Sequence, residues 1–286
     1  MLARFPKLPF LLAVARLDRP IGIYLLLWPT LWALWIAAEG FPGWHLFLVF
    51  TLGTVLTRSA GCIINDVADR HFDGGVKRTQ GRPLVTGKIS VIEALGFMLV
   101  LLFVSLTLVL TTNWPTVGLA FAGAIVAGVY PFMKRYTHLP QVILGIAFSF
   151  GIPMAFTATS NDIPHFAWLI VIANLLWTVA YDTAYAMVDR DDDLKLGIKS
   201  SAILLGDMDK AGIGALQVCM ILTLSLLLKH TELGLFFTLS LAAASASFVY
   251  QQYLIRDRDR DACFRAFLSN HWTGLIIFVG IFADYL

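Results

Sequence analysis

Long apolar runs separated by polar segments fill the sequence from residue 21 onward. Most of these runs have the roughly 20 residues that an α-helix needs to cross the hydrocarbon core of a bilayer. The pattern predicts an all-α integral membrane protein with nine transmembrane helices. The predicted spans are residues 21–38, 45–65, 91–112, 115–132, 140–158, 165–187, 211–229, 232–255 and 267–285.

Composition supports this prediction and excludes a soluble two-domain enzyme, a disordered chain and a disulfide scaffold. Apolar residues make up 58% of the chain and charged residues 14%, whereas soluble domains have about 45–50% and about 25%. The cysteines, Cys62, Cys219 and Cys263, lie in or beside apolar runs and are interpreted as small hydrophobic residues. The sequence has no phosphate-binding glycine loop, zinc-ligand spacing or nucleic-acid-binding pattern. We therefore expect the lipid bilayer, and no nucleic acid, as a partner.

The distribution of lysine and arginine predicts the orientation of the chain. All but Arg58 and Lys229 of the 21 basic residues lie in the N-terminal tail or after the second, fourth, sixth and eighth spans. Basic connections stay in the cytoplasm, so we expect a cytoplasmic N-terminus and a periplasmic C-terminus. The short tail argues against a long mitochondrial transit peptide and favours a bacterial inner (plasma) membrane. The basic residues of the tail are Arg4, Lys7, Arg16 and Arg19.

The first of two acidic clusters stands at the predicted cytoplasmic end of the second span. Asn65, Asp69 and Asp73 follow i, i+4, i+8 spacing, so on a continuing helix they share one face. Asp66 points away from that face.

The second acidic cluster begins inside the sixth span. Asp182, Asp189 and Asp193 fall within about 40° of one another around a helix of 3.6 residues per turn. Asp191 and Asp192 point elsewhere on the same helix.

The two clusters occupy matching positions in the chain. They lie four spans apart, and each precedes a long polar connection, residues 66–90 and 188–210. This arrangement predicts two pseudo-repeated four-helix units plus a ninth helix. We expect a single domain over residues 1–286, with the two connections forming cytoplasmic cap loops.

Stacked carboxylates require compensation. They repel one another on a helix face, and charges near a membrane are costly and usually functional. Mg²⁺ prefers carboxylate oxygens and typically completes its coordination with phosphate. Two facing acidic helices therefore predict a Mg²⁺–diphosphate clamp. Basic side chains suited to phosphate oxygens are Arg58, Arg78, Arg82, Lys134 and Arg135.

Two other interpretations of the acidic clusters remain open. Acidic connections of membrane proteins are often simply solvated, although two clusters at matched positions with basic neighbours disfavour this. A transporter or divalent-cation channel would also use acidic rings. It predicts ionisable residues deep in several spans, and here Arg58 is the nearest to such a residue.

The chain resembles the UbiA superfamily of intramembrane prenyltransferases. It carries that superfamily's N-D-x-x-D-x-x-x-D pattern at residues 65–73 and its D-x-x-x-D pattern at residues 189–193. The runs 78–84 and 130–135 add to the likeness, which covers essentially the whole chain. Residues 181–193 are most similar to the members that act on 4-hydroxybenzoate in ubiquinone synthesis.

The resemblance implies a fold and a set of roles. The fold is a ring-like bundle of helices around a central cavity. Asp182 would support the second motif and Asn65 would line the acceptor pocket, while Arg58 and Lys134 would hold substrate anions. Arg135 belongs to the same basic run as Lys134. Two Mg²⁺ ions, bridged by diphosphate, would be bound by Asp69, Asp73, Asp189 and Asp193.

The expected reaction is the transfer of a polyprenyl group from polyprenyl diphosphate to the ring carbon ortho to the hydroxyl of 4-hydroxybenzoate. The same chemistry on homogentisate, a naphthoate, haem or a chlorophyll precursor is the alternative. Tyr130 would stabilise an allylic cation through its ring face, or it is an ordinary tyrosine at a helix end.

Tryptophans gather near the ends of the predicted spans. Because indole rings favour the membrane–water interface, we expect them to act as interface anchors. They are Trp28, Trp32, Trp35, Trp44 and Trp114.

Overall fold

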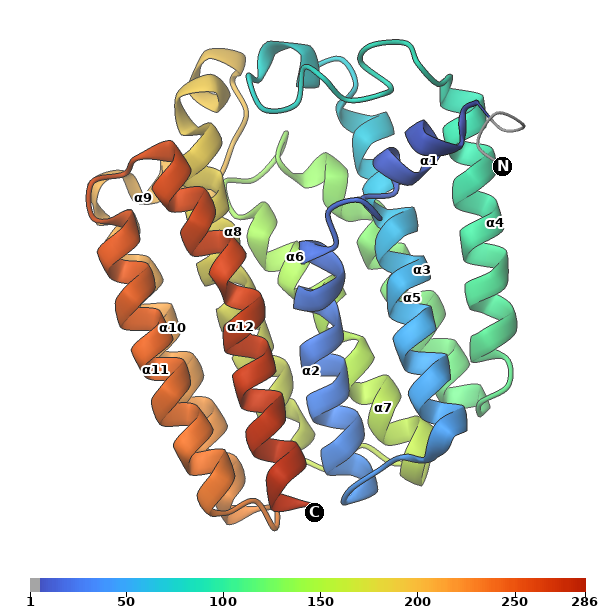
Figure 1. Cartoon of the computed structure of the whole chain (residues 1–286), viewed down its shortest axis with the longest axis vertical. Coiled ribbons are helices and arrows are strands. Elements are labelled where there is room, and N and C mark those ends of the chain that lie inside the picture. Colours follow the sequence, from blue (N-terminus) through green and yellow to red (C-terminus); the bar gives the residue numbers. More distant parts are fainter. Residues whose placement is uncertain (1–5) are drawn as a thin grey trace.

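The computed structural model describes residues 6–286, and every regular element in that range is a helix. Most helices run side by side along the long axis of the molecule (Figure 1). Arg4, one of the basic residues of the tail, lies outside the described residues. The α-helices are α1 (Leu8–Val14), α2 (Ile21–Ala38), α3 (Gly43–Asp69), α4 (Val91–Val109), α5 (Trp114–Met133), α6 (Pro140–Ser149), α7 (Gly151–Ser160), α8 (Ala167–Leu196), α9 (Ser201–Leu205), α10 (Asp209–Ser225), α11 (Leu235–Ile255) and α12 (Arg260–Asp284). The short 3-10 helices are η2 (Asp73–Gly75), η3 (Gly206–Met208) and η4 (Leu226–Lys229).

Eight segments of the described chain have the length and apolar composition of a membrane span. They are α2, α3, α4, α5, the α6–α7 pair, α8, the stretch from α9 to η4, and α12. The prediction of an all-α, multi-pass membrane protein is confirmed. α11 has 21 residues and packs along α12 (Figure 1), but the polar pair Gln251 and Gln252 lowers its hydropathy.

The fifth predicted span is two helices rather than one. α6 and α7 meet at Phe150. Pro153 has no N–H to donate to the carbonyl of Ser149, so the helical hydrogen-bond ladder is interrupted there. The run of apolar residues alone did not reveal this break.

The sixth predicted span is too short by more than two turns. α8 continues to Leu196 and ends at Gly197, whose φ of +68° is the left-handed conformation that closes many helices. The predicted loop over residues 188–210 is therefore wrong in its first part, because residues 188–196 are helical. The acidic residues at the end of α8 consequently project from a continuous helix.

Buried tryptophans join three helices at the centre of the bundle. Trp32 of α2 and Trp177 of α8 are fully buried, and their stacked ring centroids are 5.4 Å apart. The Trp177 Nε1 donates to Asn270 Oδ1 at 2.8 Å, and the Trp32 Nε1 donates to the carbonyl of Gly274 at 3.0 Å. These two bonds satisfy the indole N–H groups on α12, which permits full burial.

The predicted role of the tryptophans as interface anchors is wrong for part of the set. Trp32 and Trp35 belong to the core. Trp44 and Trp114 are 69% and 81% exposed, as an interface anchor requires. The sequence could not separate the two groups because both lie close to predicted span ends.

Close packing of α11 on α12 depends on Gly280. A Cβ at this position would lie 2.8 Å from the carbonyl oxygen of Phe236 and would collide with Ser240. Gly118 of α5 is exposed, and a Cβ added to it would meet no atom within 4 Å. Alanine gains helix propensity at both sites, so their difference isolates the packing.

We expect Gly280→Ala to destabilise the protein by about 1–3 kcal/mol relative to Gly118→Ala, because overpacking forces the two helices apart. Thermal unfolding of the purified variants in detergent measures the difference. Equal unfolding temperatures for the two variants would contradict the close approach of α11 and α12.

Candidate active site

The acidic ends of α3 and α8 meet at one end of the bundle, at the top of Figure 1. A cavity of about 140 Å³ lies between them. We call it the acidic pocket. Its charged and polar lining residues are Asn65, Asp69, Asp73, Arg78, Thr79, Tyr130, Lys134, Gln141, Asp182, Tyr185, Asp189, Asp193, Lys199 and Ser200.

Asp73 reaches the acidic pocket by a different route from the one predicted. The phase argument placed it on the same helix as Asn65 and Asp69, but α3 ends at Asp69 and Asp73 starts the separate 3-10 helix η2. A turn joins the two, in which the amide of Phe72 donates to the carbonyl of Asp69 at 2.8 Å. The Thr79 hydroxyl then donates to the carbonyl of Asp73 at 2.7 Å. The loop, and not helical phase, brings Asp73 to the pocket.

Helical phase does bring the acidic residues of α8 to the pocket. Asp182, Asp189 and Asp193 all line the acidic pocket from one uninterrupted helix. Asp191 and Asp192 do not line it and instead pair with Arg260. Helical periodicity alone was enough here because the helix does not end within the motif.

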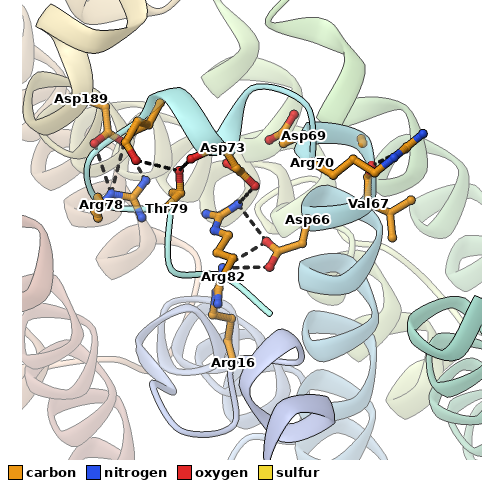
Figure 2. A network of polar contacts seen from close by, with 12 residues as sticks. Arg16, Asp66, Val67, Asp69, Arg70, Asp73, Arg78, Thr79, Arg82 and Asp189 are labelled. Carbon is orange, nitrogen blue, oxygen red and sulfur yellow. Dashed lines mark hydrogen bonds and ion pairs between the residues drawn. The ribbon is translucent and has the colours of Figure 1, made fainter. Parts of the chain in front are cut away.

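Basic side chains pair with three of the pocket carboxylates: Lys134 with Asp69, Arg78 with Asp189 and Arg82 with Asp73. Lys134, at the end of α5, has its Nζ 2.5 Å from Asp69 Oδ2. Arg78 Nη2 lies 2.6 Å from Asp189 Oδ2 (Figure 2). Each pair offsets the free-energy cost of removing a carboxylate from water. Without a partner, that cost would not be compensated.

Arg82 and Asp66 form the base of the loop that follows α3. Arg82 Nη1 lies 2.9 Å from Asp66 Oδ1 and 2.6 Å from Asp73 Oδ2, and Arg16 Nη2 lies 3.0 Å from Asp66 Oδ1 (Figure 2). Asp66 is only 2% exposed. It points away from the acidic pocket, as expected, but it fixes the arginine that holds Asp73.

The loop arginines remain cationic in this setting. Burial by itself would lower the pKa of Arg82, but Asp66 and Asp73 raise it above its ordinary value. Burial by itself would likewise lower the pKa of Arg78, but Tyr185 and Asp189 raise that pKa above its ordinary value. Both guanidinium groups therefore stay charged beside the carboxylates over the whole range of working pH.

A second and much larger cavity, of about 910 Å³, continues from the acidic pocket through the bundle. We call it the long cavity. It extends from Asn65 and Asp182 at the acidic end to Thr116, at the opposite end of α5. Its lining is mostly apolar. Four residues line both cavities: Asn65, Tyr130, Asp182 and Tyr185.

Arg58 lies in the wall of the long cavity, which Arg16 and Arg19 also line. It does not line the acidic pocket. Its Nη1 donates to Cys62 Sγ at 3.0 Å, and its guanidinium carbon lies 5.4 Å from the ring centroid of Phe148. The buried Nε has no hydrogen-bond partner among the described residues. This arrangement leaves the Arg58 guanidinium available to an anion inside a mostly apolar cavity.

Arg135 lines neither cavity. Its Nη2 donates to the carbonyl of Ala68 at 2.8 Å, and its guanidinium lies over the rings of Phe72 and Phe132. In this position Arg135 ties the end of α5 to the end of α3.

Tyr185 and Lys199 also line the acidic pocket, although neither is among the predicted site residues. The Arg78 guanidinium carbon lies 4.6 Å from the ring centroid of Tyr185. Tyr185 follows Asp182 by three residues and precedes Asp189 by four, so the helical phase used for the carboxylates would have found it. Lys199 lies beyond the end of α8, where no periodicity applies.

The pocket carboxylates fit a hard divalent cation in chemistry. In the described part of the chain, no group of three His, Cys, Asp or Glu side chains is already gathered around one point. However, Asp69 Oδ1 is buried without a hydrogen-bond partner. An unsatisfied carboxylate oxygen beside further carboxylates is the type of donor set that Mg²⁺ prefers.

Comparison with known proteins identifies the family. The model of the UbiA prenyltransferase family matches residues 26–275. The chain belongs to the UbiA prenyltransferase family. This membership agrees with the resemblance drawn from the two acidic motifs, and it favours prenyl transfer over a cation channel.

Curated relatives of this UbiA family member match it over nearly their whole length. A 4-hydroxybenzoate octaprenyltransferase of Pseudomonas aeruginosa (strain UCBPP-PA14) is 61% identical, covering 95% of this chain and 92% of the relative. A protein of the same name from Aeromonas hydrophila subsp. hydrophila is 59% identical, covering 96% of this chain and 95% of the relative.

Solved structures share the fold of this UbiA family member. The apo structure of a UbiA homolog from Aeropyrum pernix K1 superposes with a TM-score of 0.81 at 26% identity, covering 93% of this chain and 98% of that one. A UbiA homolog from Archaeoglobus fulgidus, bound to GPP and Mg²⁺, has a TM-score of 0.75 at 16% identity, covering 96% and 99%. At that identity the second likeness concerns the fold alone.

Proposed function

We propose that this protein transfers a polyprenyl group from polyprenyl diphosphate to the ring carbon ortho to the hydroxyl of 4-hydroxybenzoate, a membrane step of ubiquinone biosynthesis. The observation that carries the proposal is the junction of a charged pocket with a long apolar cavity. A lipid diphosphate has the same two parts, a charged head and an apolar tail. The choice of acceptor is supported by the relatives, which are 61% and 59% identical and carry that acceptor in their names.

The two cavities divide the substrates between them. The diphosphate lies in the acidic pocket, where Lys134 and Arg78 donate to its oxygens. The prenyl tail lies in the long cavity. The carboxylate of 4-hydroxybenzoate pairs with Arg58, whose free Nε lies in the wall of that cavity. Asn65 lines the space where the acceptor ring meets the first carbon of the tail.

The carboxylates that would hold Mg²⁺ are Asp69, Asp73, Asp189 and Asp193. When bound, the ion neutralises negative charge on the diphosphate and makes it a better leaving group. Arg82 holds Asp73 in place from the loop. Asp182 lies on the same face of α8 as Asp189 and Asp193 and supports that motif from the wall of the pocket.

This chain's own residues stabilise the charge that develops in the reaction. As the bond between the allylic carbon and the diphosphate oxygen breaks, Lys134 and Arg78 stabilise the departing anion. Tyr130 lines both cavities at their junction, where an allylic cation would form and its ring face would stabilise that cation. The ring carbon then bonds to the allylic carbon, and loss of its proton restores aromaticity. The apolar lining excludes water that would otherwise capture the cation.

The membrane arrangement is part of the proposal. We propose that α11 also spans the bilayer, which brings the number of spans to nine, and that the spans form a ring around the long cavity within one domain, residues 1–286. The protein lies in a bacterial inner membrane with its N-terminus and acidic pocket on the cytoplasmic side and its C-terminus in the periplasm. Residues 66–90 and 188–210 together cap the pocket, the second largely as helix.

Direct turnover tests the reaction. Purified protein in lipid, given Mg²⁺, polyprenyl diphosphate and 4-hydroxybenzoate, should form the 3-polyprenyl product, and excess chelator should abolish it reversibly, because the diphosphate would then leave poorly neutralised. Chromatography with mass detection measures the product. A higher rate with homogentisate or a naphthoate would shift the assignment to that acceptor, and full activity in chelator would contradict the clamp.

Isosteric substitution of single carboxylates tests their roles. Asp69→Asn, Asp189→Asn and Asp193→Asn should each lower kcat by about 100-fold or more, as loss of a charge-stabilising group at a reacting centre does. Asp257→Asn is the matched control, because Asp257 is 75% exposed and, within residues 6–286, pairs only with the neighbouring Arg256. Rates within a factor of two of the wild type for Asp69→Asn, Asp189→Asn and Asp193→Asn would rule out the acidic pocket as the site.

Cysteine labelling tests the orientation. After replacement of the native cysteines by alanine, Thr86→Cys and Lys195→Cys place thiols at exposed positions near the acidic pocket, and His230→Cys places one at the opposite end. A membrane-impermeant maleimide should label the first two only in inverted vesicles and the third only in right-side-out vesicles. The reverse pattern would place the acidic pocket in the periplasm.

A further inference from the structure

The last turns of α8 have an outer face opposite the acidic pocket, and ion pairs hold this face as well. Arg260, the first residue of α12, has its Nη1 3.1 Å from Asp192 Oδ2 and its Nη2 3.3 Å from Asp191 Oδ2. Arg190 Nη1 lies 3.5 Å from Asp209 Oδ2, at the first residue of α10. The end of α8 is therefore attached on its outer side to the starts of two other helices.

Asp209 is the buried centre of this attachment. Its side chain is fully buried, and Arg258 contacts both of its oxygens, with Nη2 2.8 Å from Oδ1 and Nε 3.0 Å from Oδ2. Arg258 has a φ of +55°. A non-glycine residue keeps such a backbone conformation only when its surroundings enforce it. Asp209 thus joins the connection between α11 and α12 to α10 through Arg258, and to α8 through Arg190.

The same helix that begins with Arg260 also contacts the inner side of α8. The ring centroid of Phe267 of α12 lies 4.5 Å from that of Tyr185, which lines both cavities. Tyr185 in turn lies under the guanidinium of Arg78, the partner of Asp189. α12 therefore contacts both faces of the stretch of α8 that carries the pocket carboxylates.

Electrostatics explains why such a brace is needed. Asp189 and Asp193 are i, i+4 neighbours of like charge, and both face Asp69 across the acidic pocket. Repulsion between these two carboxylates and Asp69 pushes the end of α8 away from α3. This end rises beyond the start of α12 at the top left of Figure 1, where fewer helices surround it. The ion pairs on the outer face fix the rotation of the helix end, so that these carboxylates stay turned toward the acidic pocket.

We propose that Arg260 is a positioning residue, assisted by Arg258: by pairing with the outer face of α8, it sets the rotation of this helix and so places Asp189 and Asp193 opposite Asp69. The proposal rests on the proposed function, since it assigns Arg260 its effect through the carboxylates of the acidic pocket. Arg260 itself lines neither cavity.

Metal binding measured directly tests the proposal. Mn²⁺, added to the purified protein with inorganic diphosphate, is quantified by electron paramagnetic resonance of the free ion. Arg260→Gln should weaken Mn²⁺ binding by about 10-fold, the usual cost of removing a group that orients metal ligands. Asp192→Asn, which removes the partner on α8, should act in the same direction. Arg260→Lys should restore part of the affinity, because it keeps the charge but loses the second contact.

Arg256→Gln is the matched control. Arg256 lies four residues earlier in the same connection, and its side-chain ion pair is with the adjacent, exposed Asp257. It should bind Mn²⁺ as the wild type does. In turnover, Arg260→Gln should raise the Mg²⁺ concentration needed for half-maximal rate about 10-fold. The KM for 4-hydroxybenzoate should stay within a factor of two, because Arg58, the proposed partner of that substrate, lies in the other cavity.

The outcomes separate the two levels of the argument. Wild-type affinity for Mn²⁺ in Arg260→Gln and Asp192→Asn would overturn the positioning role and leave the proposed function intact. An equal loss in Arg256→Gln would overturn it too, because the effect would then follow net charge rather than this contact. Failure of the wild type to bind Mn²⁺ with diphosphate would overturn the metal clamp itself, and with it the proposal.

Discussion

The cost of holding carboxylates at the end of an apolar bundle governs the structure of this protein. A buried carboxylate without a partner loses far more solvation than packing can return, so each one must find a cation or a hydrogen-bond donor. The fold supplies these from separate elements: Lys134 from the end of α5, and Arg78 and Arg82 from the loop after α3. The acidic pocket is consequently the place where several segments, distant in sequence, are bound together.

The same constraint explains why the charged pocket and the apolar cavity share a wall. Tyr130 and Tyr185 line both the long cavity and the acidic pocket, and the Tyr185 ring lies against the guanidinium of Arg78. Aromatic residues with a polar tip suit such a boundary, because one part packs against hydrocarbon and the other accepts a polar neighbour. An amphipathic lipid diphosphate meets the same division within a single molecule. The boundary and the proposed substrate match in polarity along their length.

Family membership and the close relatives support the chemistry, but the local geometry depends on features specific to each helix end. The continuous helix α8 presents Asp182, Asp189 and Asp193 on one face because it ends only at Leu196. α3 ends at Asp69, and Asp73 reaches the pocket through a loop that Thr79 and the Asp66-anchored Arg82 hold in place. Two similar motifs thus achieve similar placement by different physical means.

The sequence by itself determined the helical membrane class, the acidic motifs and most of their partners, because hydrophobic period and charge are local properties of the chain. It also placed the carboxylates of α8 correctly, since a regular helix fixes the direction of every side chain. Only the tertiary structure decided that Trp32 is buried, that Arg135 lines neither cavity and that Asp66 anchors the loop. Each of these depends on a partner far away in the sequence, such as Gly274 for Trp32 or Arg16 for Asp66. Such partners are selected by burial and electrostatics in three dimensions, and periodicity along the chain contains no information about them.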